Sequence, residues 1–233
     1  MKRIEFLSGL VMLLMLSGPA LGLTIDEFNT GPNISLDVGE NTHVPALPKT
    51  AQQVDNVPAV IGGYRDVYIE HISGDTNKEA SVTFAPVDDY LSYSNDDGIK
   101  SELTLTYDAN GAGLGGVDLT DGGTVGSLVM RFLTSDLGAN CTVTITDTSA
   151  NTLMRTLATG AGGGDLIFNF AAFTGTGDPA DADSLVFFIK LDEPSGDHSI
   201  DFIKSGNVPE PMTMAGLMLG LGALGGYIRR RKA

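Results

Sequence analysis

Short segments in which apolar and polar residues alternate fill the middle of the chain, and they constrain its fold more than any other feature. In the segment Arg65 to Ile72, residues Val67, Ile69 and His71 fall on one face and the intervening residues on the other. This period of two is typical of a β-strand with one buried face. Further segments of strand length are Thr24 to Phe28, Leu103 to Tyr107, Leu128 to Leu133, Cys141 to Asp147, Asp165 to Phe170, Leu185 to Leu191 and Ser199 to Ile203.

The spacing of these segments predicts the fold class. No stretch of the middle spaces apolar residues three and four apart over three turns, so no amphipathic helix is expected there. About ten strands separated by glycine-rich turns predict an all-β fold, an antiparallel β-sandwich or jelly roll. The segment Asn33 to Pro58 has a weaker pattern and contains Pro45, Pro48 and Pro58. We expect it to form a long connection or a loosely packed arm.

The first 22 residues have the three parts of a secretory signal peptide. Lys2 and Arg3 supply the positive start, Phe6 to Leu16 is the apolar run, and small residues precede a cleavage point after Gly22. The apolar run is short for a bilayer-spanning helix. This favours a cleaved signal over an uncleaved anchor, and it predicts export of the rest of the chain.

The C-terminal residues 208–233 combine a Pro-Glu-Pro motif, an apolar run and a basic cluster. Pro209 and Pro211 flank Glu210 and keep the chain extended. Met212 to Ile228 carries no charge over 17 residues. As a helix it would span roughly 25 Å, close to the ~30 Å hydrocarbon core. The cluster that stays on the cytoplasmic side consists of Arg229, Arg230, Arg231 and Lys232.

In this order, the three parts resemble the PEP-CTERM sorting signal. The resemblance implies that Pro209, Glu210 and Pro211 are recognised by an exosortase, a membrane-embedded enzyme similar to cysteine proteases. It also implies removal of the membrane helix during sorting to the cell surface or extracellular matrix. The alternative is an ordinary C-terminal anchor that stays uncut. Either interpretation concerns where the protein is located and does not address the function of the segment between the two ends.

Between the two ends, Leu23 to Asn207 is long enough for one domain with a sizeable core. It contains 27 Asp and Glu, since only Glu5 and Glu210 lie outside it, and 8 Lys and Arg, a net charge of −19. Such a surface excludes binding to the nucleic acid backbone. The single Cys141 excludes an internal disulfide and falls on the apolar face of a strand, so we expect a buried, unreactive thiol.

Motifs for catalysis are weak. Gly111 to Gly116 matches the dinucleotide-binding pattern, but no helix follows it, so a wide loop with glycines at positive φ is predicted. His43, His71 and His198 lack zinc-binding spacing, and there is no G-x-S-x-G elbow. The E-x-D-x-x-E strand of jelly-roll glucanases is also absent. These observations favour a protein without catalysis of its own.

The acidic turns are candidates for a structural calcium ion. Asp178, Asp181 and Asp183 lie in one turn, and calcium takes six to eight oxygen ligands. The alternative is that such turns are simply solvated and keep the protein soluble.

A second resemblance covers more of the chain. The segments TIDEF, GGVDLTDGG, CTVTITDTSAN, LIFNFAAFTG and SLVFFIKLDE are similar to jelly-roll domains of the galactose-binding-like type. Many of those domains are carbohydrate-binding modules. The resemblance implies a lectin-like fold of two facing sheets and a calcium ion near Asp26, Glu27 and Asp201.

Three functions follow as hypotheses. The first is an exported, non-enzymatic cell-surface or matrix protein linked to exopolysaccharide, and the second is a carbohydrate-binding module. The third is a secreted polysaccharide hydrolase, which needs two placed carboxylates. Sugar recognition usually stacks aromatic rings on the sugar, yet the chain has no Trp, and Tyr90 and Tyr93 are expected on opposite sides of a strand. No stacking surface is therefore evident from the sequence.

Overall fold

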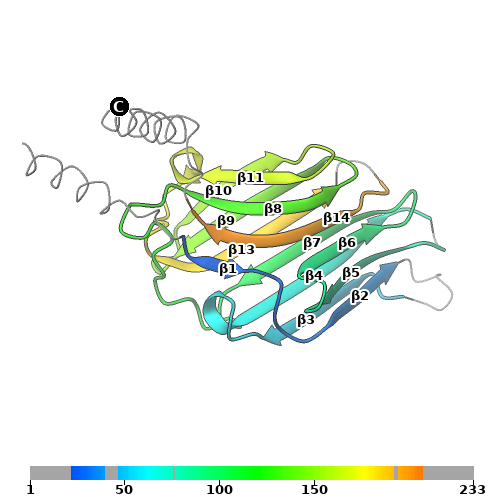
Figure 1. Cartoon of the computed structure of the whole chain (residues 1–233), viewed down its shortest axis with the longest axis horizontal. Coiled ribbons are helices and arrows are strands. Elements are labelled where there is room, and N and C mark those ends of the chain that lie inside the picture. Colours follow the sequence, from blue (N-terminus) through cyan, green and yellow to red (C-terminus); the bar gives the residue numbers. More distant parts are fainter. Residues whose placement is uncertain (1–21, 40–46, 76, 192–193, 207–233) are drawn as a thin grey trace, which may run out of the picture.

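The computed structural model describes residues 22–39, 47–75, 77–191 and 194–206. Within these ranges the protein is an all-β sandwich of two seven-stranded sheets that lie face to face (Figure 1). Every pairing between strands is antiparallel, so the predicted antiparallel β-sandwich is confirmed.

The first sheet has the order β11-β8-β14-β6-β5-β2, with β1 also paired to β14. Its strands are β1 (Thr24–Asp26), β2 (Ile34–Gly39), β5 (Glu79–Ala85), β6 (Tyr90–Asn95), β8 (Ser127–Ser135), β11 (Gly164–Asn169) and β14 (His198–Ser205). The second sheet has the order β12-β10-β9-β13-β7-β4-β3. Its strands are β3 (Thr50–Asn56), β4 (Tyr64–Ser73), β7 (Lys100–Tyr107), β9 (Ala139–Asp147), β10 (Thr152–Ala158), β12 (Thr174–Gly175) and β13 (Ala182–Leu191). Two short 3-10 helices complete the described elements, η1 (Ile61–Gly63) and η2 (Phe170–Ala172).

The core lies between the sheets and is built by alternation along each strand. On β7, Leu103, Leu105 and Tyr107 are fully buried, and the residues between them are partly exposed. On β9, Cys141 is fully buried, as predicted, and burial raises the pKa of its thiol to about 12. This thiol is therefore an unreactive core group at neutral pH.

The expectation of a loose arm at Asn33 to Pro58 is wrong. Its described part holds β2, which pairs with β5, and β3, which pairs with β4. Ile34 and Val38 of β2 are core residues. The sequence concealed β3 because it is an edge strand whose residues are mostly polar and partly exposed.

Gly111 to Gly116 forms a loop, as predicted. The chain continues from it into an isolated bridge between Val117 and Ala182 rather than into a helix. Gly113 and Gly116 have positive φ, and a Cβ atom on either would overlap a carboxylate, that of Asp183 or of Asp181. The glycine pattern thus lets this loop pack closely on two acidic side chains.

The predicted signal peptide and the predicted sorting tail lie, except for Gly22, outside the described residues, and so does His43. Among the helices that the structure does describe, none combines the length and apolar character needed to span a bilayer. The two ends of the described chain are neighbours, because Leu23 N donates to Ser205 Oγ over 2.9 Å and Ser205 N donates to Leu23 O over 2.8 Å.

Candidate functional site

The outer face of the second sheet carries a row of aromatic and hydroxyl side chains that crosses the strands. Tyr68 on β4 pairs with Thr104 on β7, and Thr104 pairs with Phe188 on β13. The row continues through Thr142 on β9 to Thr156 on β10, whose hydroxyl oxygens are 2.8 Å apart. We call these five residues the Tyr68–Phe188 row.

Strand alternation explains why these side chains face outward. Ile69 and Phe187, the chain neighbours of Tyr68 and Phe188, are fully buried in the core. Tyr68 and Phe188 are themselves half-buried. Adjacent strands lie about 4.8 Å apart, so the two aromatic residues, two strands apart, stand roughly 10 Å from each other. Two ring surfaces separated by a threonine thus lie on one line.

Polar groups border the row. Gln52 Nε2 donates to both carboxylate oxygens of Asp66 over 2.9 Å. The hydroxyl of Tyr68 donates to Glu70 Oε2 over 3.2 Å. Next to Phe188, Lys190 Nζ lies 3.0 Å from Glu102 Oε1. The face therefore presents both hydrogen-bond donors and acceptors around its aromatic rings.

Two groups on this face have shifted pKa values. Desolvation raises the pKa of Asp66, the hydrogen bond from Gln52 partly opposes this, and the nearby charge of Asp108 adds to it. Desolvation, followed by the charge of Glu70, raises the pKa of Tyr68. Tyr68 therefore stays a neutral phenol at any physiological pH, which keeps its ring uncharged for stacking.

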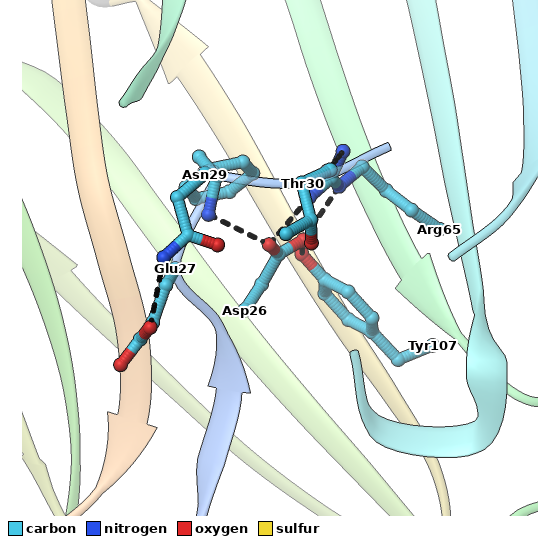
Figure 2. A network of polar contacts seen from close by, with 7 residues as sticks. Asp26, Glu27, Asn29, Thr30, Arg65 and Tyr107 are labelled. Carbon is cyan, nitrogen blue, oxygen red and sulfur yellow. Dashed lines mark hydrogen bonds and ion pairs between the residues drawn. The ribbon is translucent and has the colours of Figure 1, made fainter. Parts of the chain in front are cut away.

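Asp26, a predicted calcium ligand, lies in a buried network with Arg65 and Tyr107 (Figure 2). Arg65 donates to Asp26 through Nε over 2.6 Å and Nη2 over 2.5 Å, and Tyr107 Oη donates over 2.9 Å. The backbone N–H of Phe28 completes the contacts of this carboxylate over 2.9 Å. Both oxygens of Asp26 thus already have partners, and Arg65 neutralises its charge.

Glu27 and Asp201, the other two residues of that predicted set, lie apart from this network. They line a shallow pocket of about 280 Å³ together with Asn29, Asp89 and Phe202. Glu27 accepts a hydrogen bond from Asn29 Nδ2 over 3.0 Å and points away from Asp26 (Figure 2). The structure therefore brings Glu27 and Asp201 together but turns Asp26 into the core.

In the alternative calcium set, Asp178 and Asp181 precede β13 and Asp183 lies at its start, and each carboxylate accepts a hydrogen bond from a backbone or side-chain group. Asp178 accepts from Ala180 N over 2.9 Å, and Asp183 accepts from Gly115 N over 3.0 Å. Asp181 accepts from the hydroxyl of Thr148. Within the described ranges, no group of three or more His, Cys, Asp or Glu side chains is arranged to hold a metal ion. Calcium binding by either set stays a prediction.

The described histidines are core residues. His71 and His198 are both buried. The ring of His198 packs against Tyr93 and Phe132, with centroids 6.1 Å and 5.9 Å away. Burial lowers the pKa of His198, and the charges of Asp136 and Asp197 oppose this only in part. His198 is therefore a structural residue that stays neutral at neutral pH.

Comparisons with known proteins assign no family to the chain. No protein-family model matches the chain, and a search of curated proteins found no match. Among solved structures, the chain is similar to a family 11 carbohydrate-binding module from Clostridium thermocellum in complex with a β-1,3-1,4-mixed-linked tetrasaccharide. The identity is 12%, the match covers 77% of this chain and 97% of that chain, and the TM-score is 0.35.

Two further similar structures are TmCBM61 in complex with β-1,4-galactotriose and an exo-β-agarase. For TmCBM61 the identity is 9%, the coverage 68% of this chain and 88% of that chain, and the TM-score 0.31. For the agarase the identity is 12%, the coverage 82% of this chain and 25% of that chain, and the TM-score 0.41. At these values none of the similarities assigns a ligand or an activity to this chain.

Sequence reasoning missed the Tyr68–Phe188 row. Alternation placed Tyr68 opposite the core face of its strand, which the structure confirms. Phe188, however, lies in the continuously apolar run LVFFIKL, which conceals which of its residues face outward. The alternation of Leu185, Phe187 and Ile189 with Val186 and Phe188 was the available sign. The register that aligns Tyr68 with Phe188 was not readable from the sequence.

Proposed function

We propose that this protein is an exported, non-enzymatic cell-surface or matrix protein that binds a polysaccharide along the outer face of its second sheet. The Tyr68–Phe188 row carries this proposal. Two half-buried rings on one line offer apolar surfaces for sugar rings. The threonine hydroxyls between and beyond them can donate to and accept from sugar hydroxyls. An extended sugar chain laid across the strands would meet these groups in succession.

The fold and the termini support the same proposal. The chain crosses repeatedly between two antiparallel sheets, and this arrangement is consistent with a jelly roll. The sequence of residues 1–22 supports export. The motif Pro209, Glu210 and Pro211, with the apolar run and basic cluster that follow, supports sorting by an exosortase-like enzyme. Such a protein would reach the cell surface or matrix, where exopolysaccharide is present.

A protein that binds without catalysis fits the composition of this face. Its central row consists of aromatic and hydroxyl groups, and Glu102 beside the row forms a salt bridge with Lys190. The sequence also lacks the strand motif of jelly-roll glucanases. A release assay for reducing sugar ends separates this proposal from the hydrolase hypothesis, because a hydrolase would release sugar ends from the polysaccharide that it binds.

Affinity electrophoresis of the full chain in detergent, in gels that contain soluble polysaccharides, tests the proposal. We expect retardation by at least one polysaccharide and a loss of about tenfold in affinity for Tyr68→Ala and for Phe188→Ala, the scale of one lost aromatic contact. Tyr90→Ala is the matched control, because Tyr90 is a half-buried tyrosine on the first sheet. The proposal fails if no polysaccharide is bound, or if all three variants bind like the unchanged protein.

A further inference from the structure

We infer that the polysaccharide bound by the Tyr68–Phe188 row carries free amino groups, whose ammonium charges meet the carboxylates beside Tyr68. This inference rests on the proposed function and specifies the chemistry of its ligand. It follows from the charges that lie beside the aromatic row on the outer face of the second sheet.

Carboxylates stand on both sides of the Tyr68 ring. Asp66 and Glu70 are two residues before and two residues after Tyr68 on β4, so they share its face. At about 3.4 Å per residue, each lies roughly 7 Å from Tyr68 along the strand. Substituents at the rim of a sugar ring stacked on Tyr68 would point toward these carboxylates. An ammonium substituent offers three donors to such acceptors, whereas a uronate would be repelled.

The second sign of a cationic ligand is that Glu70 lacks, within the described part of the chain, the countercharge that its cross-strand neighbour Glu102 has. The two residues lie directly opposite each other on β4 and β7. Like charges in this arrangement destabilise a sheet. Lys190 lies 3.0 Å from Glu102 and offsets that charge. Among the residues that the structure describes, no salt bridge involves Glu70, which accepts a hydrogen bond from the neutral hydroxyl of Tyr68.

The same charges separate candidate ligands. A cation above Glu70 would neutralise this carboxylate as Lys190 neutralises Glu102, whereas a neutral sugar would leave Glu70 without a countercharge from the described residues. An acidic polysaccharide would add negative charge to a domain that already has a net charge of −19. The face is therefore complementary to an amine-bearing polymer and opposed to a polymer of uronic acids.

The test compares three polymers with the full chain in detergent at 0.15 M salt: de-N-acetylated polyglucosamine, its N-acetylated form and polygalacturonate. We expect the affinity order polyglucosamine, then the N-acetylated form, with polygalacturonate unbound. Glu70→Gln should weaken polyglucosamine binding about tenfold and leave binding of the N-acetylated form within about twofold. Glu79→Gln controls for unspecific attraction of a polycation, since it makes the same charge change on β5 of the first sheet.

The possible outcomes distinguish the inference from the proposed function. Equal losses for Glu70→Gln and Glu79→Gln would mean unspecific attraction and would overturn the inference. Equal affinity for the amine-bearing and N-acetylated polymers, or binding of polygalacturonate, would overturn it too, while leaving the proposed function standing. Failure to bind any polysaccharide, or binding that Tyr68→Ala leaves unchanged, would overturn the proposed function itself.

Discussion

The buried pair of Arg65 and Asp26 predicts a large and specific loss of stability when Arg65 is replaced. Arg65 is fully buried and Asp26 is 1% exposed. The guanidinium carbon also lies 5.0 Å and 4.7 Å from the ring centroids of Phe28 and Phe84. Arg65→Met fills similar space with apolar atoms but leaves the carboxylate of Asp26 buried without its countercharge.

The magnitude follows from the burial of both partners. Removing one member of a buried pair costs about 3–5 kcal/mol. For a domain of this size each kcal/mol lowers the melting temperature by about 2–4 °C, so Arg65→Met should lower it by roughly 10 °C. Urea unfolding followed by circular dichroism gives the free energy directly, provided that m is unchanged.

A double variant and a control sharpen this test. Arg65→Met combined with Asp26→Leu removes both charges, so it should recover part of the stability lost in Arg65→Met alone, although the Tyr107 hydroxyl and the Phe28 N–H lose their acceptor. Arg131→Met breaks a pair whose side chains are 45% and 31% exposed, and should cost at most about 1 kcal/mol. A loss below about 1 kcal/mol for Arg65→Met, or a double variant no more stable than the single one, would refute the reasoning.

Four further outcomes are expected. Gly113→Ala should destabilise the domain by about 1–3 kcal/mol in urea unfolding, because Gly113 has φ +83° and an added Cβ would overlap Asp183; Gly111→Ala, with open space around it, should cost less. Burial lowers the pKa of His198 in the native protein, so at acidic pH the unfolded chain binds a proton that the native protein does not. The free energy of unfolding should therefore fall as the pH drops through about 6.5. His198→Phe should flatten this part of the curve of stability against pH, and an unchanged slope would contradict the account. If the predicted calcium site exists, millimolar calcium should raise the melting temperature and EDTA should lower it, whereas equal melting curves would speak against it. Mass spectrometry of the protein from its native cell should show a start at Leu23 and loss of the apolar run Met212 to Ile228; an intact C-terminus would favour an ordinary anchor over sorting.

Local patterns predicted most of the strands and the class of the fold. Alternation in Leu103 to Tyr107 and Cys141 to Asp147 identified core faces that the structure confirms. It failed where a strand lies at an edge, as at Thr50–Asn56, since its polar residues need no apolar partner. The sequence analysis also did not identify the strand Glu79–Ala85, although its apolar residues Val82 and Phe84 alternate with polar ones and are buried.

The candidate site was harder to predict because it depends on contacts between distant segments. The acid at Asp26 looked like a calcium ligand until the structure placed Arg65, 39 residues later, against it. The Tyr68–Phe188 row needs the register of β4, β7 and β13, which is fixed by packing of the inner faces. Residue types alone show which groups are available, whereas register decides which of them meet.

The buried network also explains how the N-terminal strand closes the sandwich. β1 pairs with β14, so Leu23 and Ser205 meet across 182 residues of chain. Asp26, at the end of β1, binds Arg65 on β4 and Tyr107 on β7, which belong to the opposite sheet. One short strand thus connects β14 of the first sheet to β4 and β7 of the second. Because this closure needs β14, which ends at Ser205, the domain can complete its fold only after nearly all of the segment from Leu23 to Asn207 is present.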